Sequence, residues 1–440
     1  MGHSFTWAGG LCAAALALSG CMSDIARVFD PADMVTRMKT PDASQAVKPT
    51  YAEKISADSQ IIQGLSLRAS VLPVGTVSDQ VASAVLAANS RTAEAELRAA
   101  TLRSEAASKN WLPRIGPQVS LTSLGAVAAN LVVDQVLFDN GRRKGERAFA
   151  VADVEVAAVS LAQDTNNRVA TALKLYTAAA EARETAALDQ MTLKDMTHFA
   201  WVMGERVKGG VSDMSDLTIL RQKLSEIRAS HDAAVEREAT SIAELNAMSV
   251  IPLGDLRGVP DVPVTAFSGA PLNVVRSEAE KTRAIAAAKV ARAGQLPGLS
   301  AGGTVGEGST LGLRIGSDQL LGFGTKASLE AIAQADETAT RKLRQSVEDS
   351  NRNLRRLERQ ISAKTRQADE AATLAAQARR NLDIFQEQYD AGQRQVMDVV
   401  GVYETYARQQ QTQVVLKYDV VRLKIEMAEL QGVLADGSAI

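Results

Sequence analysis

The chain has 440 residues, of which 46% are hydrophobic and only 4% aromatic, and its formal charge at pH 7 is −2. This length allows two or three ordinary domains, yet no proline occurs from Gln118 to Ile251 or from Gly298 to Ile440. Because proline is costly inside helices, both intervals favour very long helices over ordinary globular cores. The nearly balanced, mixed charge indicates no nucleic-acid partner.

The first residues resemble a bacterial lipoprotein signal. An apolar run from Trp7 leads into Leu18-Ser19-Gly20-Cys21, the residue pattern of a lipobox. The run is shorter than the roughly 20 apolar residues of a membrane-spanning helix and has the length of a signal-peptide core. We expect residues 1–20 to be removed and Cys21 to carry the lipid. The alternative is a signal peptide with a coincidental cysteine, because the first residues contain neither Lys nor Arg.

The residues around the lipobox also predict a location. Cys12 lies in the segment to be removed, so the mature chain would contain only Cys21 and no internal disulfide. Lipoproteins held at the inner membrane usually carry Asp directly after the cysteine, whereas Met22 follows here. We therefore expect a lipid anchor in the outer membrane, with the rest of the chain extending into the periplasm.

The chain contains an internal repeat. Three landmarks recur in the same order at a nearly constant separation of about 183 residues, which is the mark of a duplication. Trp111-Leu112-Pro113 matches Gln295-Leu296-Pro297, Leu137-Phe138-Asp139-Asn140-Gly141 matches Leu320-Leu321-Gly322-Phe323-Gly324, and Gly210 with Asp216-Leu217 matches Gly392 with Asp398-Val399.

Each half contains a predicted strand pair. Thr310–Gly316 alternates strictly, with Leu311, Leu313 and Ile315 on one face and Arg314 on the other. Its predicted partner is Leu299–Val305, and the first half offers Ile115–Leu124 and Asn130–Phe138. Strands of about 9 to 11 residues suit a tilted membrane strand. A soluble hairpin with one polar face is the alternative.

A long helix follows each predicted hairpin. No glycine occurs from Glu146 to Met203 or from Thr325 to Ala391, and a helix of this length measures on the order of 100 Å. Heptads run from Val347 to Tyr389 in the second half and from Thr165 to Val207 in the first, as in coiled coils. Turns at Gly209, Gly210 and Gly392 separate the long helices from return helices at Asp213–Met248 and Val396–Gln431. Shorter helices are expected at Ser78–Asn110 and Leu272–Ala293.

We therefore predict a mainly α fold with a small β part, formed by two tandem repeats of a β-hairpin plus long coiled-coil helices. An open four-stranded sheet cannot lie in lipid because its edges would leave backbone groups unpaired, and small closed barrels need about eight strands. Copies of the chain must then complete the barrel. The predicted segments are 1–20 (signal peptide), 21–78 (lipid-anchored extension), 79–249 (first repeat), 250–271 (linker), 272–432 (second repeat) and 433–440 (tail).

Leu137–Arg143, Tyr389–Gly392 and Asp398-Val399, in this order, resemble the TolC-like outer-membrane efflux family in its lipid-anchored branch, over about residues 79–432. The resemblance implies a homotrimer, with a twelve-stranded β-barrel in the outer membrane that continues into an α-helical barrel. It also implies a periplasmic adaptor protein and an inner-membrane transporter as partners, in efflux or type I secretion. No cofactor is expected.

The resemblance further implies that the turns at Gly209, Gly210 and Gly392 form the periplasmic entrance. Asp398 matches the family's first acidic site, while Gly401 stands at the second. A three-fold ring of Asp398 would favour cations. The alternative is an Asp that stabilises a helix N-terminus, and Asp216 in the first repeat fits this local role better.

The remaining candidates are weaker. Arg314 is a possible lumen-facing residue or a spare surface charge, and Trp111, Phe138 and Phe323 are candidate interfacial anchors. His198 and His231 stand singly without metal-ligand neighbours, so we expect neither a metal site nor an enzyme. The rival function is a lipid-anchored periplasmic coiled-coil adaptor or scaffold.

Overall fold

The computed structural model describes residues 50–88, 92–123, 126–264, 269–305, 309–317 and 322–437. Cys21, the signal segment and the landmark residues Leu320 and Leu321 lie outside the described residues. All helices and strands below belong to one structural unit, Tyr51–Ile440.

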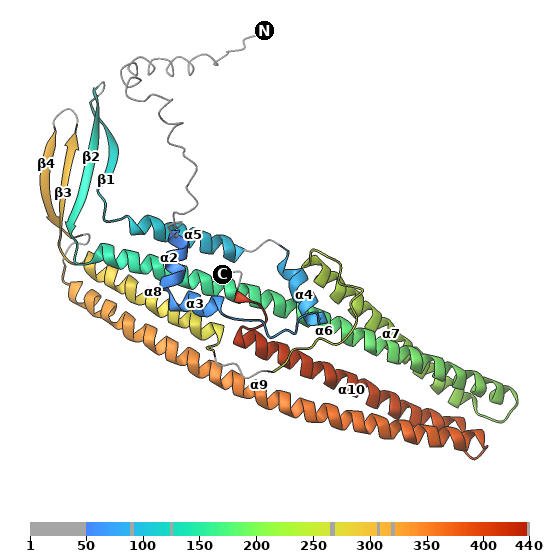
Figure 1. Cartoon of the computed structure of the whole chain (residues 1–440). Coiled ribbons are helices and arrows are strands. Elements are labelled where there is room, and N and C mark those ends of the chain that lie inside the picture. The colour runs from blue at the N-terminus through green and yellow to red at the C-terminus, as the bar shows by residue number, and fades with distance from the viewer. Residues whose placement is uncertain are drawn as a thin grey trace, which may run out of the picture. The chain divides into compact units, whose positions relative to one another are not determined.

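Two very long helices and their return helices form the body of this unit (Figure 1). Helix α6 spans Arg142–Lys208 and returns as α7, Met214–Ala247, whereas α9 spans Thr325–Asp390 and returns as α10, Val396–Gln431. The predicted long and return helices are confirmed. Helix α6 also includes Gly145, where an added Cβ atom would come within 3.0 Å of Val290 Cγ2, so the glycine allows the close approach of the neighbouring helix.

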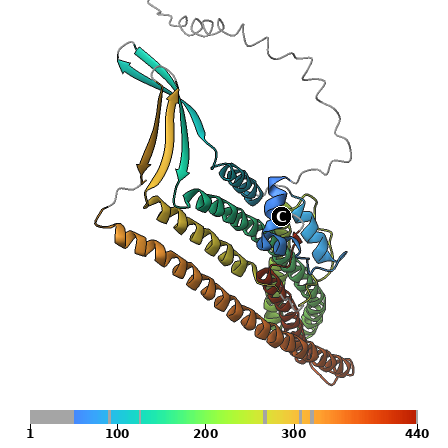
Figure 2. The ribbon, with the colours of Figure 1, turned by 60° about the vertical axis from the view of Figure 1, so that its left-hand side comes forward.

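The heptad pattern describes only part of α9. Ala375 and Leu382, in the half near the turn, are buried against the neighbouring helices, but Val347 is 38% exposed. Within the described residues the upstream half of α9 packs mainly on one helix, α8 (Leu272–Gly294). Figure 2 shows this part of α9 at the side of the unit. In this half Leu357 is buried, whereas Leu343 and Leu354 are only partly covered and Val347 is exposed.

One predicted helix proved to be two. The expected single helix at Ser78–Asn110 is wrong, because α4 spans Val77–Leu86 and a separate helix, α5, spans Thr92–Ser108. The chain between them contains Asn89-Ser90, residue types that favour caps and turns over helix interiors. Both helices pack on α6 but at different levels, since α4 joins the core around Leu173 and Tyr176 while α5 lies nearer the sheet.

Two short helices precede α4, namely α2 (Tyr51–Asp58) and α3 (Gln60–Ser66). Ile55, Ile62 and Leu65 bury their side chains in a core shared with α6 and α8. The segment after α3 then meets the C-terminal segment, because Val71 N donates to Val433 O at 2.9 Å and Arg68 donates to Gln431 O at 2.8 Å. The two ends of the unit thus fasten together at mid-length of the helices.

The four strands form one antiparallel sheet in the order β1-β2-β3-β4. They span Arg114–Ser123, Ala126–Phe138, Gly298–Val305 and Thr310–Gly316. Both predicted hairpins are confirmed, although β2 begins four positions earlier than expected, because Ala126–Ala129 pair with β1 despite the low strand propensity of alanine. The pairing of β2 with β3, as in Leu131 opposite Val305, joins the two repeats.

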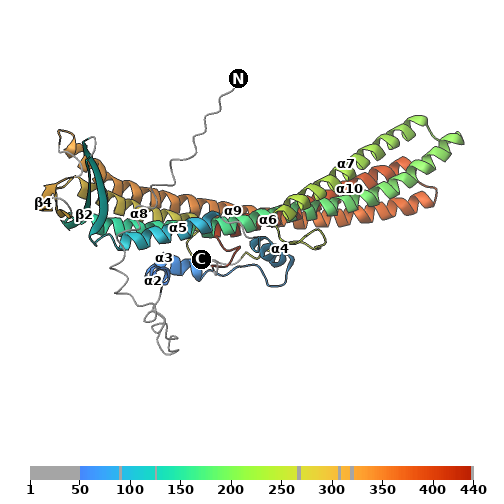
Figure 3. The same cartoon turned by 90° about the horizontal axis from the view of Figure 1, so that it is seen from above.

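The sheet and the helical turns lie at opposite ends of the unit, as Figures 1 and 3 show. Three separate cores follow the helices between these ends. The first lies near the sheet, the second at mid-length, and the third at the turns, where Met196, Phe199 and Leu220 meet Leu382 and Tyr403. The fold is therefore a long helical layer that separates a small sheet from two exposed turns.

Candidate functional site

One face of the sheet is apolar. Because alternate residues of a strand share a face and directly opposite residues lie on the same side, the register of the four strands defines this surface. We call it the apolar face; its described side chains are Ile115, Pro117, Leu131, Val133, Gln135, Leu299, Ala301, Val305, Leu311, Leu313 and Ile315. Gln135 is the one polar member among them.

The opposite face is polar and is called the polar face below. Its polar side chains within the described residues are Arg114, Gln118, Asn130, Asp134, Ser300, Thr304, Thr310 and Arg314. The two threonine hydroxyls lie 2.9 Å apart, across the β3–β4 pair. The structure thus places Arg314 on the polar side of its strand, as the alternation predicts.

The apolar face is uncovered in the single chain. Leu311 is 90% exposed, Leu313 71% and Ile315 77%. Contiguous apolar surface of this kind marks a site that another protein or a membrane covers. Strands β1 and β4 also present unpaired edges, because the sheet ends with them. The sheet therefore lacks a cover for one face and a partner for each edge.

Exposed aromatic residues gather at the end of the sheet that adjoins the helices. Trp111 precedes β1, Phe138 ends β2 and Phe323 precedes α9, and all three side chains are more than half exposed. Aromatic rings favour the level of lipid headgroups.

Among the helices of the described residues, none is both long and apolar enough to cross a membrane.

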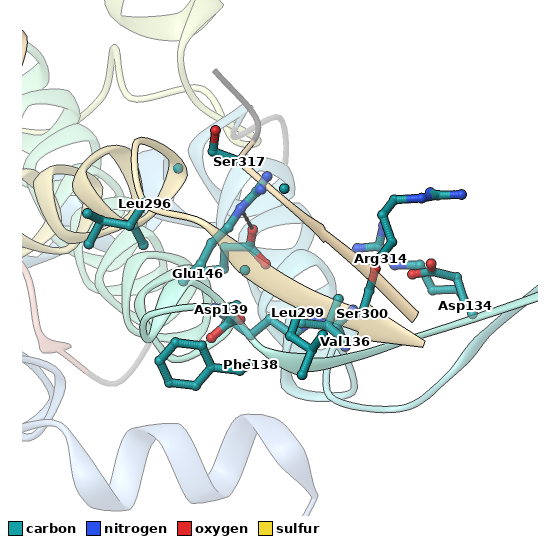
Figure 4. A pocket seen from close by; sticks show the side chains of 17 residues that line it. Asp134, Val136, Phe138, Asp139, Glu146, Leu296, Leu299, Ser300, Arg314 and Ser317 are labelled. Atoms are coloured by element: carbon teal, nitrogen blue, oxygen red, sulfur yellow. Dashed lines mark hydrogen bonds and ion pairs between the residues drawn. The ribbon is translucent and has the colours of Figure 1, made fainter. Parts of the chain in front are cut away.

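A cavity of about 420 Å³ lies at the foot of the polar face, between the sheet and the start of α6 (Figure 4). Several of its charged side chains are already engaged. Arg142 Nε donates to Glu146 Oε1 at 3.0 Å, and the other carboxylate oxygen of Glu146 accepts from Asn110 at 3.0 Å. Asp139 accepts from the backbone N–H groups of Gly141 and Arg143 at 3.0 and 2.8 Å, at the start of α6.

The other end of the unit contains two equivalent turns. In each turn a backbone N–H bonds to the carbonyl five residues earlier, Val211 to Arg206 at 2.9 Å and Gln393 to Gln388 at 2.8 Å. Gly210 and Gly392 adopt the left-handed conformation that this motif requires, with φ of 72° and 76°. Gly209, with φ of −78°, is the helix cap before the turn. The two halves of the chain therefore share the same backbone hydrogen bond and the same left-handed glycine in their turns.

Asp398 lies in the first turn of α10, on its exposed side. Its Oδ2 accepts from Gln395 N at 3.2 Å, and the Gln395 side chain accepts from the Asp398 N–H in return, which forms a capping box. Val399 and Val400 next to it are fully buried. Asp398 thus stabilises the N-terminus of α10, while its side chain is also exposed to solvent. Asp216 occupies the equivalent place in α7.

In the first repeat the helix cap is a different residue. Asp213 precedes α7 and accepts from Ser215 N at 3.2 Å. These backbone and side-chain hydrogen bonds from Ser215 hold the pKa of the Asp213 carboxyl below its ordinary value. The two turns are therefore capped by different chemistry, with Asp213 in the first repeat and the Gln395–Asp398 box in the second.

Contacts between the two repeats near the turns were missed by the sequence reasoning. Tyr403 on α10 donates to Asp195 Oδ2 on α6 at 2.7 Å, and burial, reinforced by this hydrogen bond, raises the pKa of Tyr403 above its ordinary value. Lys223 on α7 also forms an ion pair with Glu404. The partners are common residue types about 200 positions apart, so no local sequence signal marks them.

Further polar pairs continue this connection along α6 and α10. Glu181 accepts from Arg422, Glu184 accepts from Lys417 at 2.7 Å, and the buried Asp189 accepts from Gln411 at 2.7 Å. Arg422 also donates to Asp419 of its own helix. Burial opposes the charge of Asp419, but hydrogen bonds from Arg422 and Lys364 outweigh it and lower the pKa of Asp419. The two repeats are thus joined by ion pairs and hydrogen bonds between residues 181–189 of α6 and 411–422 of α10.

The two described histidines do not form a site. His198 stacks on Trp201 with ring centroids 6.2 Å apart, and His231 Nδ1 lies 3.1 Å from Asp232 Oδ1. Within the part of the chain that the structure describes, no group of three His, Cys, Asp or Glu residues is arranged to hold a metal ion.

Comparisons with known proteins rest on structure alone, because no family model matches the sequence. No curated protein matches it either. The outer-membrane channel OprN is 16% identical with a TM-score of 0.71, over 83% of this chain and 93% of OprN. The outer membrane protein VceC of Vibrio cholerae is 13% identical with a TM-score of 0.68, over 87% and 97% of the two chains.

The open-state MtrE outer membrane channel of Neisseria gonorrhoeae is similar to the same degree. It is 15% identical with a TM-score of 0.66, over 85% of this chain and 94% of MtrE. Together with the two-faced sheet and the paired helical hairpins, these matches define a class of fold. The chain has the fold of the TolC-like outer-membrane channels, mainly helical with a small antiparallel sheet.

Proposed function

We propose that this chain is the subunit of a homotrimeric channel-tunnel in the outer membrane. The observation that carries the proposal is the sheet, whose exposed apolar face and open edges suit a barrel wall in lipid and no soluble arrangement of one chain. The polar face then lines an aqueous lumen. The likeness in fold to OprN, VceC and MtrE supports the same function.

Three copies suit this geometry better than two. The described part of each chain supplies four strands, so a dimer would close an eight-stranded barrel whose interior is filled by side chains. A trimer would close about twelve strands and leave an open lumen. The exposed upstream half of α9 offers surface for a neighbouring copy in the helical part. The helical barrel would then continue the lumen through the periplasm.

The mass of the detergent-purified protein tests the assembly. A trimer in size-exclusion chromatography with light scattering is the expected result. The rival function, a lipid-anchored periplasmic adaptor or scaffold, predicts that the protein becomes a soluble monomer once its anchor is removed, and this result would exclude the channel. The uncovered apolar face favours the channel, because a soluble adaptor would leave this apolar surface exposed to water.

The proposed route includes two partners. A periplasmic adaptor protein would contact the exposed turns at Gly209, Gly210 and Gly392. An inner-membrane transporter would deliver the substrate through this adaptor, in efflux or in type I secretion.

A lipid on Cys21 would hold the chain to the outer membrane. Incorporation of labelled palmitate tests this anchor; the wild type is expected to be labelled and Cys21→Ser is not, whereas equal labelling would argue against Cys21 as the site.

Asp398 is proposed as an acidic gate at the periplasmic entrance, with Asp216 in a supporting place. Asp398→Ala is expected to raise single-channel conductance in planar bilayers by about two-fold and to weaken cation preference, since a ring of carboxylates holds cations in a narrow pore. Asp398→Asn separates charge from capping, because its amide oxygen still accepts from Gln395 N. Both Asp398 variants are expected to change conductance and selectivity in the same way if the charge matters, and Asp216→Asn, at the supporting place, is expected to have a smaller effect. Unchanged conductance and selectivity in Asp398→Asn would remove the charge from the gate.

A further inference from the structure

The polar face carries three charged side chains near its helix-facing end. Arg114 begins β1 directly opposite Asp134 of β2, and Arg314 lies opposite Ser300 on the other edge strand, β4. Within the described residues none of these three side chains forms a hydrogen bond or ion pair, unlike Arg142 at the same level, which bonds to Glu146. The polar face therefore has one more positive than negative charge, and its arginines lack fixed counter-ions.

Small residues leave room for a ligand beside these charges. Gly302 and Gly312 continue the row of Arg114 and Asp134 across β3 and β4. An added Cβ at Gly302 would lie 3.6 Å from Asp134 Oδ2, and one at Gly312 would meet nothing within 4 Å. The cavity of about 420 Å³ lies next to this row, toward the helices, and its lining includes all three charged side chains together with Gly298 and Gly316 (Figure 4).

Assembly would add a second arginine to each site. The arginines stand on the two edge strands, Arg114 on β1 and Arg314 on β4. A ring of copies closes only if β4 of one subunit pairs with β1 of the next, since these strands form the two edges of the sheet within the described residues. Each seam between subunits would then bring Arg314 of one copy and Arg114 of its neighbour to the same end of the barrel and the same face.

We propose that Arg114 and Arg314 form an anion-binding site at each seam of the barrel, where a phosphate, sulfonate or carboxylate group of the substrate binds on its way out. Two guanidinium groups on one wall repel each other unless an anion lies between them, and each can donate paired hydrogen bonds to a tetrahedral or planar anion. Asp134 weakens the site and allows release. This inference rests on the proposed channel and concerns the barrel alone, where the wall favours anions, whereas the Asp398 ring proposed at the periplasmic entrance favours cations.

Ion selectivity of the channel in planar bilayers tests the site. In the variant R114Q/R314Q, the chloride-to-potassium permeability ratio is expected to fall by about three-fold, because charges on a pore wall set the local ion concentrations. R114K/R314K keeps the charge and should keep most of the ratio. Arg98→Gln on α5, which removes an exposed arginine away from the sheet, is the matched control. Asp134→Asn should shift selectivity in the opposite direction, toward anions.

Binding of inorganic tripolyphosphate to the detergent-purified trimer is the second measurement. This assay does not require the protein to conduct ions. The wild type should bind it and R114Q/R314Q should lose this binding by at least about ten-fold. If the wild type conducts but R114Q/R314Q has unchanged selectivity and binding, the anion site is overturned and the channel stands. If the wild type does not conduct at all, the channel itself fails, and tripolyphosphate binding still decides whether the arginine pair holds anions.

Discussion

Leu313→Arg is expected to prevent stable insertion of the protein into the outer membrane. Leu313 lies in the middle of β4 on the apolar face and is 71% exposed in the single chain. If lipid covers this face, an arginine near the middle of the bilayer costs about 2–4 kcal/mol per chain. A trimer would contain three such substitutions, so the barrel should be lost.

The neighbouring residue provides the control for this prediction. Gly312→Arg adds the same charge one position away, but on the polar face, where an added Cβ meets nothing within 4 Å. The measurement is the yield of heat-resistant trimer in isolated outer membranes. Leu313→Arg should give little trimer and Gly312→Arg close to the wild-type amount. Equal yields would mean that lipid does not cover the apolar face.

Asn166→Ala is expected to destabilise the helical body by about 2–3 kcal/mol. Asn166 is only 2% exposed, and both the nitrogen and the oxygen of its side-chain amide form hydrogen bonds. Its Nδ2 donates to Glu429 O at 2.8 Å, and its Oδ1 accepts from the N–H of Leu434 at 3.0 Å. Because Leu434 is fully buried, the variant leaves its N–H without an acceptor, and unpaired buried groups cost about 1–3 kcal/mol each.

Chemical unfolding followed by the helical circular dichroism signal measures this loss. Asn167→Ala is the matched control, because Asn167 is the next residue of α6 and its side chain is exposed. The midpoint should fall clearly in Asn166→Ala and stay near the wild type in Asn167→Ala. Similar midpoints in the two variants would show that Asn166 does not fasten the C-terminal segment to α6.

Features that repeat or alternate along the chain could be predicted from the sequence. The alternation of Thr310–Gly316 predicted β4 and the place of Arg314 on its polar side, and the glycine-free intervals predicted α6 and α9. These signals are local, because a strand or helix with one buried face has a fixed spacing of apolar residues. The duplicated turns followed from the same kind of pattern at Gly210 and Gly392.

Features that depend on distant residues could not be predicted. The short helices α2 and α3 carry only a few buried residues, such as Ile55 and Leu65, and their place is set by packing on α6 and α8. Tyr403 and Asp195 meet only because the two repeats align. Arg114 was missed since it stands one position before the predicted strand, and Asp134 because its alternation with Asn130 was not followed across the sheet.

The central claim is that copies of this chain enclose a continuous aqueous pore, and conductance in planar bilayers tests it most directly. The purified wild-type trimer, added to one side of the membrane, is expected to give long-lived, discrete current steps of uniform size. A trimeric preparation that inserts into the bilayer but gives no steps above background would contradict the channel.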